Sequence, residues 1–222
     1  ETAILNMVNH QSLIATKAAR VVYAARGDGI MEFGLRRAQG PDAGIYGARA
    51  ALIGGCIGTS NVLTGKMFGV PVKGTHAHSW IMSFPDEYTA FKTYAELYPN
   101  ACILLVDTYD VLDSGVPNAI RVFKEMKEKD PGFKNYGIRI DSGDLAYLSK
   151  EAYKMLDTAG FGDAVISASS DLDEYLIDSL KAQGAKINSW GVGTNLITSK
   201  DCPAFGGVYK LAAIKDQEDA VF

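Results

Sequence analysis

Two histidines, His76 and His78, lie one residue apart in the stretch VKGTHAHSW. In an extended segment, side chains at positions i and i+2 point to the same face. Imidazole is partly unprotonated near neutral pH, so the pair suits two metal ligands, or one nucleophile or acid/base group. A third alternative is that the rings pack beside the core.

A metal site would need ligands beyond these two residues. The only other histidine is His10, in an upstream helical segment, and a metal such as zinc normally draws more nitrogen or sulfur ligands. A metal-dependent barrel hydrolase that uses His76 and His78 therefore stays an alternative. The sequence favours His78 as the reactive residue and His76 as a structural one.

The segment GIRIDSGDL places an arginine and two carboxylates around a Ser-Gly turn. Arg139 and Asp141 share a strand face, which suits a substrate with a phosphate or carboxylate next to ribose hydroxyls. The alternative is that Asp141 caps the next helix and pairs locally with Arg139. In SASSD, Ser170 or Asp171 is the predicted helix cap, and Ser169 is a candidate for the site.

The segment GVGTNL follows the strand-like INSW. Its small residues let backbone N–H groups approach an anion, and Thr194 adds a hydroxyl donor. This pattern predicts a phosphate site from Gly191 to Thr194, and the alternative is an ordinary glycine turn. Gly206 and Gly207, in GGV, form a second candidate loop for close approach.

Further charged residues follow apolar segments. Asp107, in DTYD, ends the apolar run CILLV, where a carboxylate rarely serves packing, and Asp110 is interpreted as the cap of the following helix. MEFGLRR presents Glu32 beside Arg36 and Arg37. The double arginine indicates either an anion site or a solvated edge.

Short β-rich runs alternate with helical stretches, such as GIYGARAALIGGCIGTSNVLTGKMF and VPNAIRVFKEMKEKD. This alternation predicts six or seven βα units and an α/β fold with a parallel sheet. Nearly every expected strand ends in a polar cluster, and in a (β/α) barrel all these ends converge on one face. An open doubly wound sheet concentrates polar residues at its switch point instead. We therefore predict one (β/α) barrel-like catalytic domain over residues 1–222. The expected strand segments are MEFGLRR, PVKGTHAHSW, ACILLVDTYD, YGIRIDSGD, DAVISASSD, INSWGVGTNL and GGVYKLAAI.

The composition argues against several classes of protein. A net charge of −4 lacks the basic footprint of nucleic-acid binding, and no apolar run reaches transmembrane length. Cys56, Cys102 and Cys202 form no CxxC motif or disulfide framework, which favours a reducing, cytoplasmic compartment. Both ends are expected to be cut from a longer chain. The helical pattern begins at the first residues, and the C-terminal LAAIKDQEDAVF is read as a strand, an acidic turn and the start of another strand.

Six motifs in order resemble the nicotinate phosphoribosyltransferase family: EFGLRRAQGPDAG, GTHAHSW, DTYD, GIRIDSGDL, GVGTNL and PAFGGVYKL. The resemblance implies a type II phosphoribosyltransferase fold, with a barrel-like domain beside an N-terminal domain, and a homodimer that shares its site. The implied reaction joins nicotinate to 5-phosphoribosyl 1-pyrophosphate (PRPP), giving nicotinate mononucleotide and pyrophosphate. It implies Mg²⁺ as cofactor and ATP as co-substrate, hydrolysed through a phosphohistidine.

The resemblance also implies roles for individual residues. His78 matches the histidine of the family's G-T-x-A-H-S motif and is the implied phosphorylated residue, whereas His76 occupies the variable position. Asp107 is implied to lie close to His78 and to the pyrophosphate. No metal ion is expected to be held by the protein alone, because Mg²⁺ is implied to bind through the substrate pyrophosphate, with Asp107 as one further contact. The other implied site residues are Glu32 and Leu35 near the base, Gly74 by the base or ribose, Arg139, Asp141 and Ser142 at the base, phosphate and ribose, and Gly191, Gly193 and Thr194 at the 5′-phosphate, with Ser169, Gly206 and Gly207 as further substrate contacts.

Two features of the family are missing from this sequence. They are the N-terminal region, which contributes residues to the site across a subunit interface, and further C-terminal segments. A fragment that is inactive alone, or that binds a nucleotide without turnover, is therefore an alternative. The choice of nicotinate over nicotinamide or quinolinate is also left open.

Overall fold

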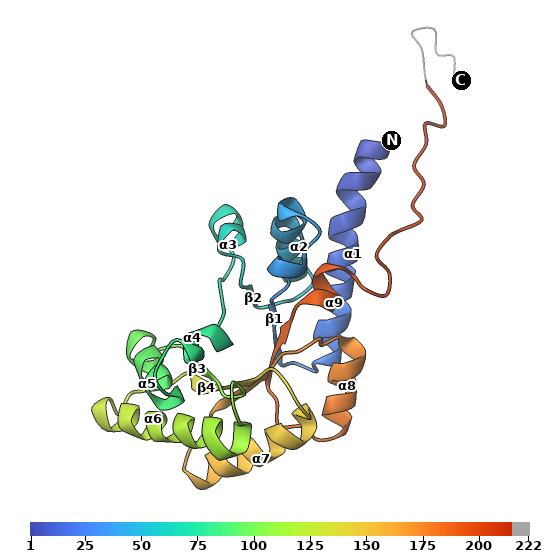
Figure 1. Cartoon of the computed structure of the whole chain (residues 1–222). Helices are drawn as coiled ribbons and strands as arrows, with labels where there is room; N and C mark the ends of the chain where they lie inside the picture. Colours follow the sequence, from blue (N-terminus) through green and yellow to red (C-terminus); the bar gives the residue numbers. More distant parts are fainter. Residues whose placement is uncertain (215–222) are drawn as a thin grey trace.

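The computed structural model describes residues 1–214, and its centre is a curled sheet of six parallel strands (Figure 1). The strand order is β2-β1-β6-β5-β4-β3. Ile30 of β1 lies opposite Trp190 of β6, so early and late strands meet as they do in a barrel. The strands are β1 (Gly29–Glu32), β2 (Gly58–Thr59), β3 (Cys102–Leu105), β4 (Tyr136–Ile140), β5 (Val165–Ala168) and β6 (Ser189–Val192). The predicted barrel-like α/β core is confirmed, and it is open between β2 and β3.

Helices cover the outer side of the curled sheet, as Figure 1 shows for the helices that follow β3, β4 and β5. A long N-terminal helix packs against the second and eighth helices. The helices are α1 (Thr2–Ala24), α2 (Pro41–Ile53), α3 (Val62–Phe68), α4 (His78–Met82), α5 (Glu87–Leu97), α6 (Val116–Lys129), α7 (Leu145–Thr158), α8 (Glu174–Ala182) and α9 (Thr194–Ile197), with a 3₁₀ turn η1 (Leu35–Arg37) and a π-helical turn η2 (Val111–Gly115).

Aspartates begin four of these helical segments. The carboxylates of Asp86, Asp110, Asp144 and Asp173 accept hydrogen bonds from N–H groups in the first turns of α5, η2, α7 and α8. Such groups have no partner within the helix itself, so the caps fix where each helix starts. The predicted cap Asp110 is confirmed. The alternative in which Asp141 caps the next helix is wrong, because Asp144 takes that position.

The core lies between the sheet and its helices. Trp190, Phe91 and Phe123 are its largest fully buried side chains, and burying such a side chain contributes about 1.5–3 kcal/mol. Cys56 and Cys102 are buried free thiols, and Cys202 is free and exposed, in agreement with the prediction that no disulfide framework is present. Within residues 1–214, no helix combines the length and apolarity needed to cross a membrane.

Three expected elements differ from the structure. In PVKGTHAHSW only Val72 forms a bridge, to Thr59, and a helix begins at His78 instead of a continuing strand. The region after α2, expected to be helical, contains the short strand β2. Residues 203–214 form no strand, since they run exposed beside α1 and pair with no strand of the sheet. The acidic turn and further strand expected after them fall on residues 215–222, which lie outside the described residues.

Candidate active site

A cavity of about 270 Å³ lies at the carboxyl ends of β1, β4, β5 and β6. In barrels of parallel strands this face carries the functional groups. Six of the predicted site residues line the cavity, together with the double arginine noted above. The lining residues are Phe33, Arg36, Arg37, Arg139, Asp141, Ser169, Ser170, Asp171, Gly191, Gly193 and Thr194.

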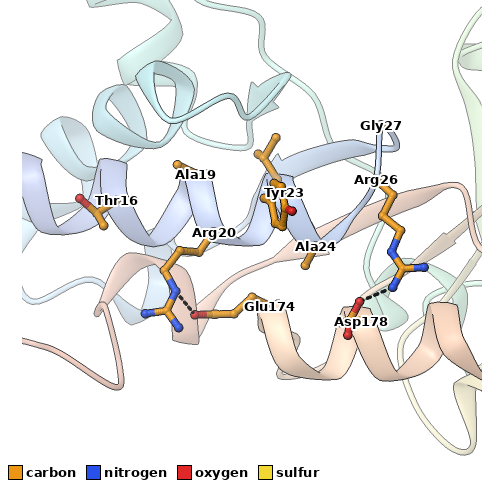
Figure 2. Close-up of a pocket in the computed structure, with 10 residues that line it drawn as sticks. Thr16, Ala19, Arg20, Tyr23, Ala24, Arg26, Gly27, Glu174 and Asp178 are labelled. Carbon is orange, nitrogen blue, oxygen red and sulfur yellow. Dashed lines mark hydrogen bonds and ion pairs between the residues drawn. The ribbon is translucent and has the colours of Figure 1, made fainter.

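A larger and more open hollow of about 1010 Å³ lies between α1 and α8 (Figure 2). Its charged groups pair with one another, because Arg20 lies 2.9 Å from Glu174 and Arg26 lies 2.5 Å from Asp178. The strand-end cavity instead presents cations and carboxylates toward a common space. We therefore take the smaller cavity as the candidate active site.

Arg139 and Asp141 come from the end of β4 and line the cavity side by side. Nη2 of Arg139 lies 3.8 Å from Oδ2 of Asp141, and Nη1 donates a hydrogen bond to Oγ1 of Thr75. Oγ of Ser169 donates to Oδ1 of Asp141. Burial lowers the pKa of Arg139, and the nearby carboxylates of Asp141 and Asp107 oppose that shift. A guanidinium remains charged at neutral pH, so an anion-binding fork and a carboxylate face the same cavity.

His78 is the first residue of α4, and it lies next to Asp107, just beyond β3. Its Nε2 is 3.2 Å from Oδ1 of Asp107, whose side chain is only 1% exposed. The other carboxylate oxygen, Oδ2, accepts hydrogen bonds from the backbone N–H of Asp141 at 3.0 Å and from Oγ of Ser142 at 2.5 Å. Asp107 therefore joins the histidine to the loop that carries Asp141 into the cavity.

His76 points elsewhere, so the expectation that both imidazoles face one space is wrong. The chain turns into α4 at His78, whereas the ring of His76 is buried and lies edge-on to Tyr94, with 4.6 Å between the ring centroids. Its Nε2 accepts a hydrogen bond from the backbone N–H of Leu105 at 3.2 Å. Burial lowers the pKa of His76 to about 4, so the ring is neutral at pH 7. Among residues 1–214, no group of three metal-ligating side chains is assembled.

Glu32 ends β1 and is fully buried. Its Oε2 accepts a hydrogen bond from Oγ1 of Thr59 at 2.6 Å, and Oε1 accepts one from the N–H of Gly34. Burial raises the pKa of Glu32, although both hydrogen bonds oppose the shift. These contacts join β1 to β2 and fix the turn that carries Phe33 and the partly exposed Leu35. Glu32 therefore supports the wall of the cavity and does not face into it.

Gly191 and Gly193 are required for close packing rather than for a turn, since neither has a positive φ. A Cβ added to Gly191 would lie 2.5 Å from the ring of Phe33, and one added to Gly193 would lie 3.1 Å from the Phe33 carbonyl oxygen. The loop after β6 can therefore lie against the segment after β1.

The segment after β5, beside this loop, has an unusual backbone. Ser170 and Asp171 have φ angles of 99° and 44°, a conformation that non-glycine residues rarely adopt. Neither residue caps the following helix as predicted, because Asp173 does so. Both side chains instead belong to the lining of the cavity.

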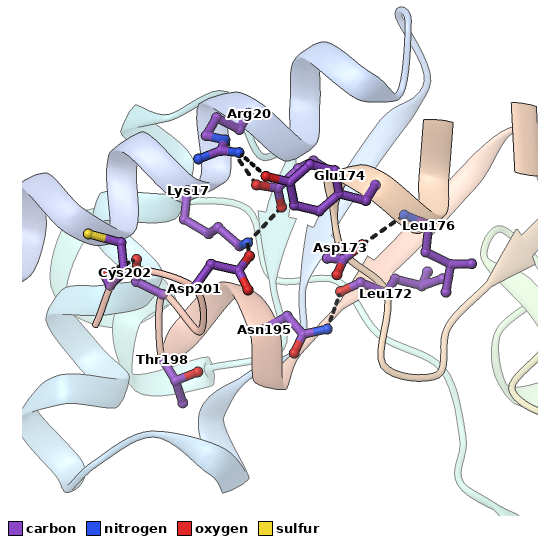
Figure 3. A network of polar contacts seen from close by, with 12 residues as sticks. Lys17, Arg20, Leu172, Asp173, Glu174, Leu176, Asn195, Thr198, Asp201 and Cys202 are labelled. Atoms are coloured by element: carbon purple, nitrogen blue, oxygen red, sulfur yellow. Dashed lines mark hydrogen bonds and ion pairs between the residues drawn. The ribbon is translucent and has the colours of Figure 1, made fainter. Parts of the chain in front are cut away.

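Asn195 holds this segment against the loop after β6, and the sequence reasoning missed it. It is almost fully buried, and its Nδ2 donates to the carbonyl oxygen of Asp171 at 2.8 Å. The same Nδ2 donates to the carbonyl oxygen of Leu172 at 3.2 Å (Figure 3). Phe33 was missed in the same way. Phe33 lies inside the motif EFGLRR, and Asn195 lies inside GVGTNL. Their place within these motifs was the one sequence feature that could have identified them as site residues.

A buried ion-pair network holds the segment that follows α9. Nζ of Lys17 lies 2.7 Å from both Glu174 and Asp201, and Arg20 also contacts Glu174 (Figure 3). Burial alone would lower the pKa of Lys17, but the bonds to Asp201 and Glu174 raise it overall. The network joins α1 and α8 to Asp201, in the segment that follows α9.

Three predicted glycines are not brought into the cavity. Gly74 and Gly206 have open space where a Cβ would be added. A Cβ on Gly207 would lie 3.5 Å from Leu5 and Asn9 of α1. Gly206 and Gly207 therefore lie along α1, and Gly74 lies in the irregular segment before α4.

Comparison with known proteins agrees with this geometry. Residues 29–218 match the model of the nicotinate phosphoribosyltransferase (NAPRTase) family. The chain is 61% identical over 216 residues to nicotinate phosphoribosyltransferase of Bacillus subtilis (strain 168), covering 97% of this chain and 43% of that protein. It is 42% identical over 260 residues to the enzyme of the same name from Dictyostelium discoideum, covering 96% and 44% of the two chains. The chain thus spans about half the length of the curated relatives it matches.

Solved structures have the same fold. The human nicotinic acid phosphoribosyltransferase structure aligns with a TM-score of 0.77 at 32% identity, over 87% of this chain and 49% of that one. A nicotinate-nucleotide pyrophosphorylase structure from Pyrococcus furiosus aligns with a TM-score of 0.73 at 31% identity, over 90% and 50%. Because the family model matches most of the length of this chain, the chain belongs to the nicotinate phosphoribosyltransferase family.

Proposed function

We propose that the whole protein joins nicotinate to PRPP, forming nicotinate mononucleotide and pyrophosphate, and couples this reaction to ATP hydrolysis through a phosphohistidine at His78. The observation that carries the proposal is the strand-end cavity. There, arginines, a carboxylate, a close-packed glycine loop and an aromatic ring face one space. These groups match an aromatic acid, a ribose and a phosphate bound next to one another.

The base and the donor phosphate bind on opposite sides of Phe33 in this proposal. The ring of Phe33 offers an apolar face for nicotinate, and the guanidinium of Arg139, 5.9 Å from the ring centroid, is placed to meet its carboxylate. The 5′-phosphate binds the backbone of Gly193 and Thr194, with Arg36 and Arg37 of the cavity as counter-charges.

Asp141 and its partners then hold the ribose. One carboxylate oxygen of Asp141 is fixed by Ser169, which orients the group toward the cavity. Phosphoribosyl transfer passes through a transition state with positive charge on the sugar ring, so a fixed carboxylate stabilises it more than the ground state. Positioning two bound substrates supplies much of the remaining acceleration. Ser142, Leu35 and Gly74 are proposed as secondary contacts.

His78 carries the step that uses ATP. Because Nε2 faces Asp107, the nitrogen free to react is Nδ1. Nδ1 attacks the γ-phosphorus, the N–P bond forms, and the bond from phosphorus to the bridging oxygen breaks as ADP leaves. The proton on Nε2 stays hydrogen-bonded to Asp107, whose negative charge stabilises the cationic ring. Water later attacks the phosphorus, the N–P bond breaks, inorganic phosphate is released and the imidazole is restored.

The described residues do not fit a protein-held magnesium ion. Both oxygens of Asp107, the one protein contact that was considered for the ion, already contact His78, Asp141 or Ser142, and the oxygens of Asp141 face Ser169 and Arg139. Mg²⁺ typically binds through few carboxylates and several substrate oxygens. We therefore propose that Mg²⁺ enters with the pyrophosphate of PRPP. A homodimer and a cytoplasmic location complete the proposal, the latter because the cysteines are free.

A product assay on the full-length protein tests the function. Nicotinate, nicotinamide and quinolinate are each supplied with PRPP and ATP, and we expect nicotinate mononucleotide with nicotinate as the preferred base. Quinolinate belongs in the comparison because a solved structure at 31% identity is named for nicotinate-nucleotide pyrophosphorylase activity. Binding of nicotinate mononucleotide without turnover would identify a non-catalytic protein instead.

A labelling experiment tests the phosphohistidine. With γ-labelled ATP, we expect an acid-labile, base-stable label that is absent from His78→Ala and that stays on His78 when His76 is replaced by Ala. Labelling that persists in His78→Ala but disappears in His76→Ala would overturn this assignment. Circular dichroism of each variant confirms that its fold is retained.

A further inference from the structure

One edge of β3 has no strand beside it among residues 1–214, since β4 is its only neighbour in the sheet. The N–H groups of Cys102 and Val106 donate to carbonyls on the β4 side. Alternate N–H groups of a strand point to opposite edges, so the N–H of Leu105 points to the open one. Leu105 is fully buried, and an unpaired buried N–H costs about 1–3 kcal/mol.

His76 supplies the missing acceptor. Its Nε2 accepts from the N–H of Leu105 at 3.2 Å, and the ring is only 7% exposed. The ring packs between β3 and the aromatic side chains of Phe91 and Tyr94 on α5. Because Nε2 is the acceptor, the proton of the neutral ring lies on Nδ1.

The same segment is joined to β2 by its backbone. Lys73 donates its N–H to the carbonyl of Thr59 at 2.9 Å, and Thr59 donates to the carbonyl of Pro71 at 3.1 Å. The chain from Pro71 to His76 therefore crosses the gap between β2 and β3. It pairs with β2 through backbone groups and with β3 through one imidazole.

The next contact follows in register. His78, two residues after His76, meets Asp107, which lies two residues after Leu105. We propose that His76 takes the place of a strand at the open edge of β3 and thereby positions His78 against Asp107. His76 is thus a positioning residue for the reaction proposed above, and only the labelling readout below depends on that reaction.

The competing interpretation is that His76 only fills space. A phenylalanine keeps the ring volume and the contact with Tyr94 but accepts no hydrogen bond. A glutamine packs less well than a ring against Tyr94. It places its side-chain carbonyl oxygen, a hydrogen-bond acceptor, at about the same distance from the backbone as Nε2 of histidine. The pair His76→Phe and His76→Gln therefore separates packing from hydrogen bonding, and His10→Gln, on α1, is the matched control.

The first measurement uses the unmodified full-length protein and requires no variant. Nitrogen-15 NMR of the imidazoles at pH 7 reports which ring nitrogen carries the proton. We expect the Nδ1–H tautomer for His76, the less common form of free neutral histidine. A His76 signal of the Nε2–H tautomer would overturn the proposal, whether or not the enzyme activity is as proposed.

The second measurement follows the variants. Hydrogen exchange at the Leu105 amide is expected to accelerate at least tenfold in His76→Phe and to stay within about threefold of the unmodified protein in His76→Gln. The rate of His78 labelling from γ-labelled ATP is expected to fall about tenfold in His76→Phe, to recover in His76→Gln, and to be unchanged in His10→Gln. Equal behaviour of the Phe and Gln variants in exchange would show that His76 only packs.

The two proposals fail in different ways. If the unmodified protein is never labelled, the proposed function fails, while the tautomer and the Leu105 exchange still decide the role of His76. If labelling is normal in His76→Phe and Leu105 exchange is unchanged, the positioning role fails while the proposed function stands.

Discussion

The two sides of the candidate site are built differently. On the β3–β4 side, His78 is held by side-chain contacts to the buried carboxylate of Asp107, which accepts three hydrogen bonds or close polar contacts in all. On the β5–β6 side, the wall consists of backbone that can approach closely because Gly191 and Gly193 have no side chains. The first side depends on charge and protonation, and the second depends on shape. Substitutions on the two sides should therefore affect different kinetic parameters.

The largest effect is expected from Asp107→Asn. Asparagine has one side-chain oxygen that accepts hydrogen bonds and one NH₂ group that donates them. It therefore cannot keep both the contact to His78 and the hydrogen bonds from the loop after β4. We expect kcat of the ATP-coupled reaction to fall on the order of 1000-fold, as in other histidine–carboxylate pairs, while the KM for PRPP changes little. Asp110→Asn is the control, since asparagine also caps helices well. A kcat near normal in Asp107→Asn would mean that the pair has no catalytic role.

The pH dependence of stability should come from the β3 side. The pKa of His76 is lowered from 6.5 to about 4, so the folded state binds fewer protons than the unfolded state between these values. The contribution of His76 to the free energy of unfolding is therefore fully present above pH 6.5. It falls by about 3 kcal/mol as the pH is lowered toward 4. Arg139 and His78 add to the shift, and the other neighbours, Tyr94 and Phe91, stay uncharged. Urea unfolding at several pH values measures the slope, which should be shallower in His76→Gln.

Gly193→Val tests the shape of the β6 side. A Cβ at this position already lies 3.1 Å from the Phe33 carbonyl, and the two methyl groups of valine require more space. We expect the KM for PRPP to rise about 30-fold, or about 2 kcal/mol, with a much smaller change in kcat. Gly193→Ala adds only the Cβ and should give a smaller increase. An unchanged KM for PRPP in Gly193→Val would remove this loop from the donor site.

Arg139→Lys tests a residue shared by both sides, since it contacts Thr75 and lines the cavity. Lysine supplies a point charge in place of a planar fork, so kcat/KM should fall about tenfold for nicotinate. Arg121→Lys, on the surface of α6, is the control. If kcat/KM for both substrates stays near normal in Arg139→Lys, the arginine has only a structural role.

The smallest effect is expected from Asn195→Ala. The variant loses two hydrogen bonds that hold the backbone at Asp171 and Leu172, which corresponds to about 1 kcal/mol and a rise of about fivefold in the KM for PRPP. Asn188→Ala removes a hydrogen bond to Ile166 away from the cavity and should leave the KM unchanged. Equal KM values in the two variants would show that the turn at Ser170 and Asp171 does not need Asn195.

Much of the fold could be predicted because it depends on local patterns. The apolar run CILLV followed by an amphipathic segment predicted β3 and α6, and Asp110 was correctly assigned as a cap. The polar clusters after β4, β5 and β6 were expected to meet, since parallel strands in a barrel end on one face, and their residues do line one cavity. The strand expected at residues 208–214 is absent because a strand forms only beside a partner, and the local pattern does not specify one.

The sequence by itself determined where the strands end and which polar residues stand at those ends. Strand alternation and helix caps each depend on only a few neighbouring residues, so they can be recognised in the sequence. Only the tertiary structure decided which histidine meets the carboxylate of Asp107. His76 is drawn inward by the N–H of Leu105 and His78 meets Asp107, each across 29 residues of sequence. It also decided that Gly191 and Gly193 serve close packing against Phe33, and that Asn195 joins two walls. Such contacts depend on which strand edges are left unpaired and on how closely two loops approach each other. Both are set by the order of the strands in the folded sheet.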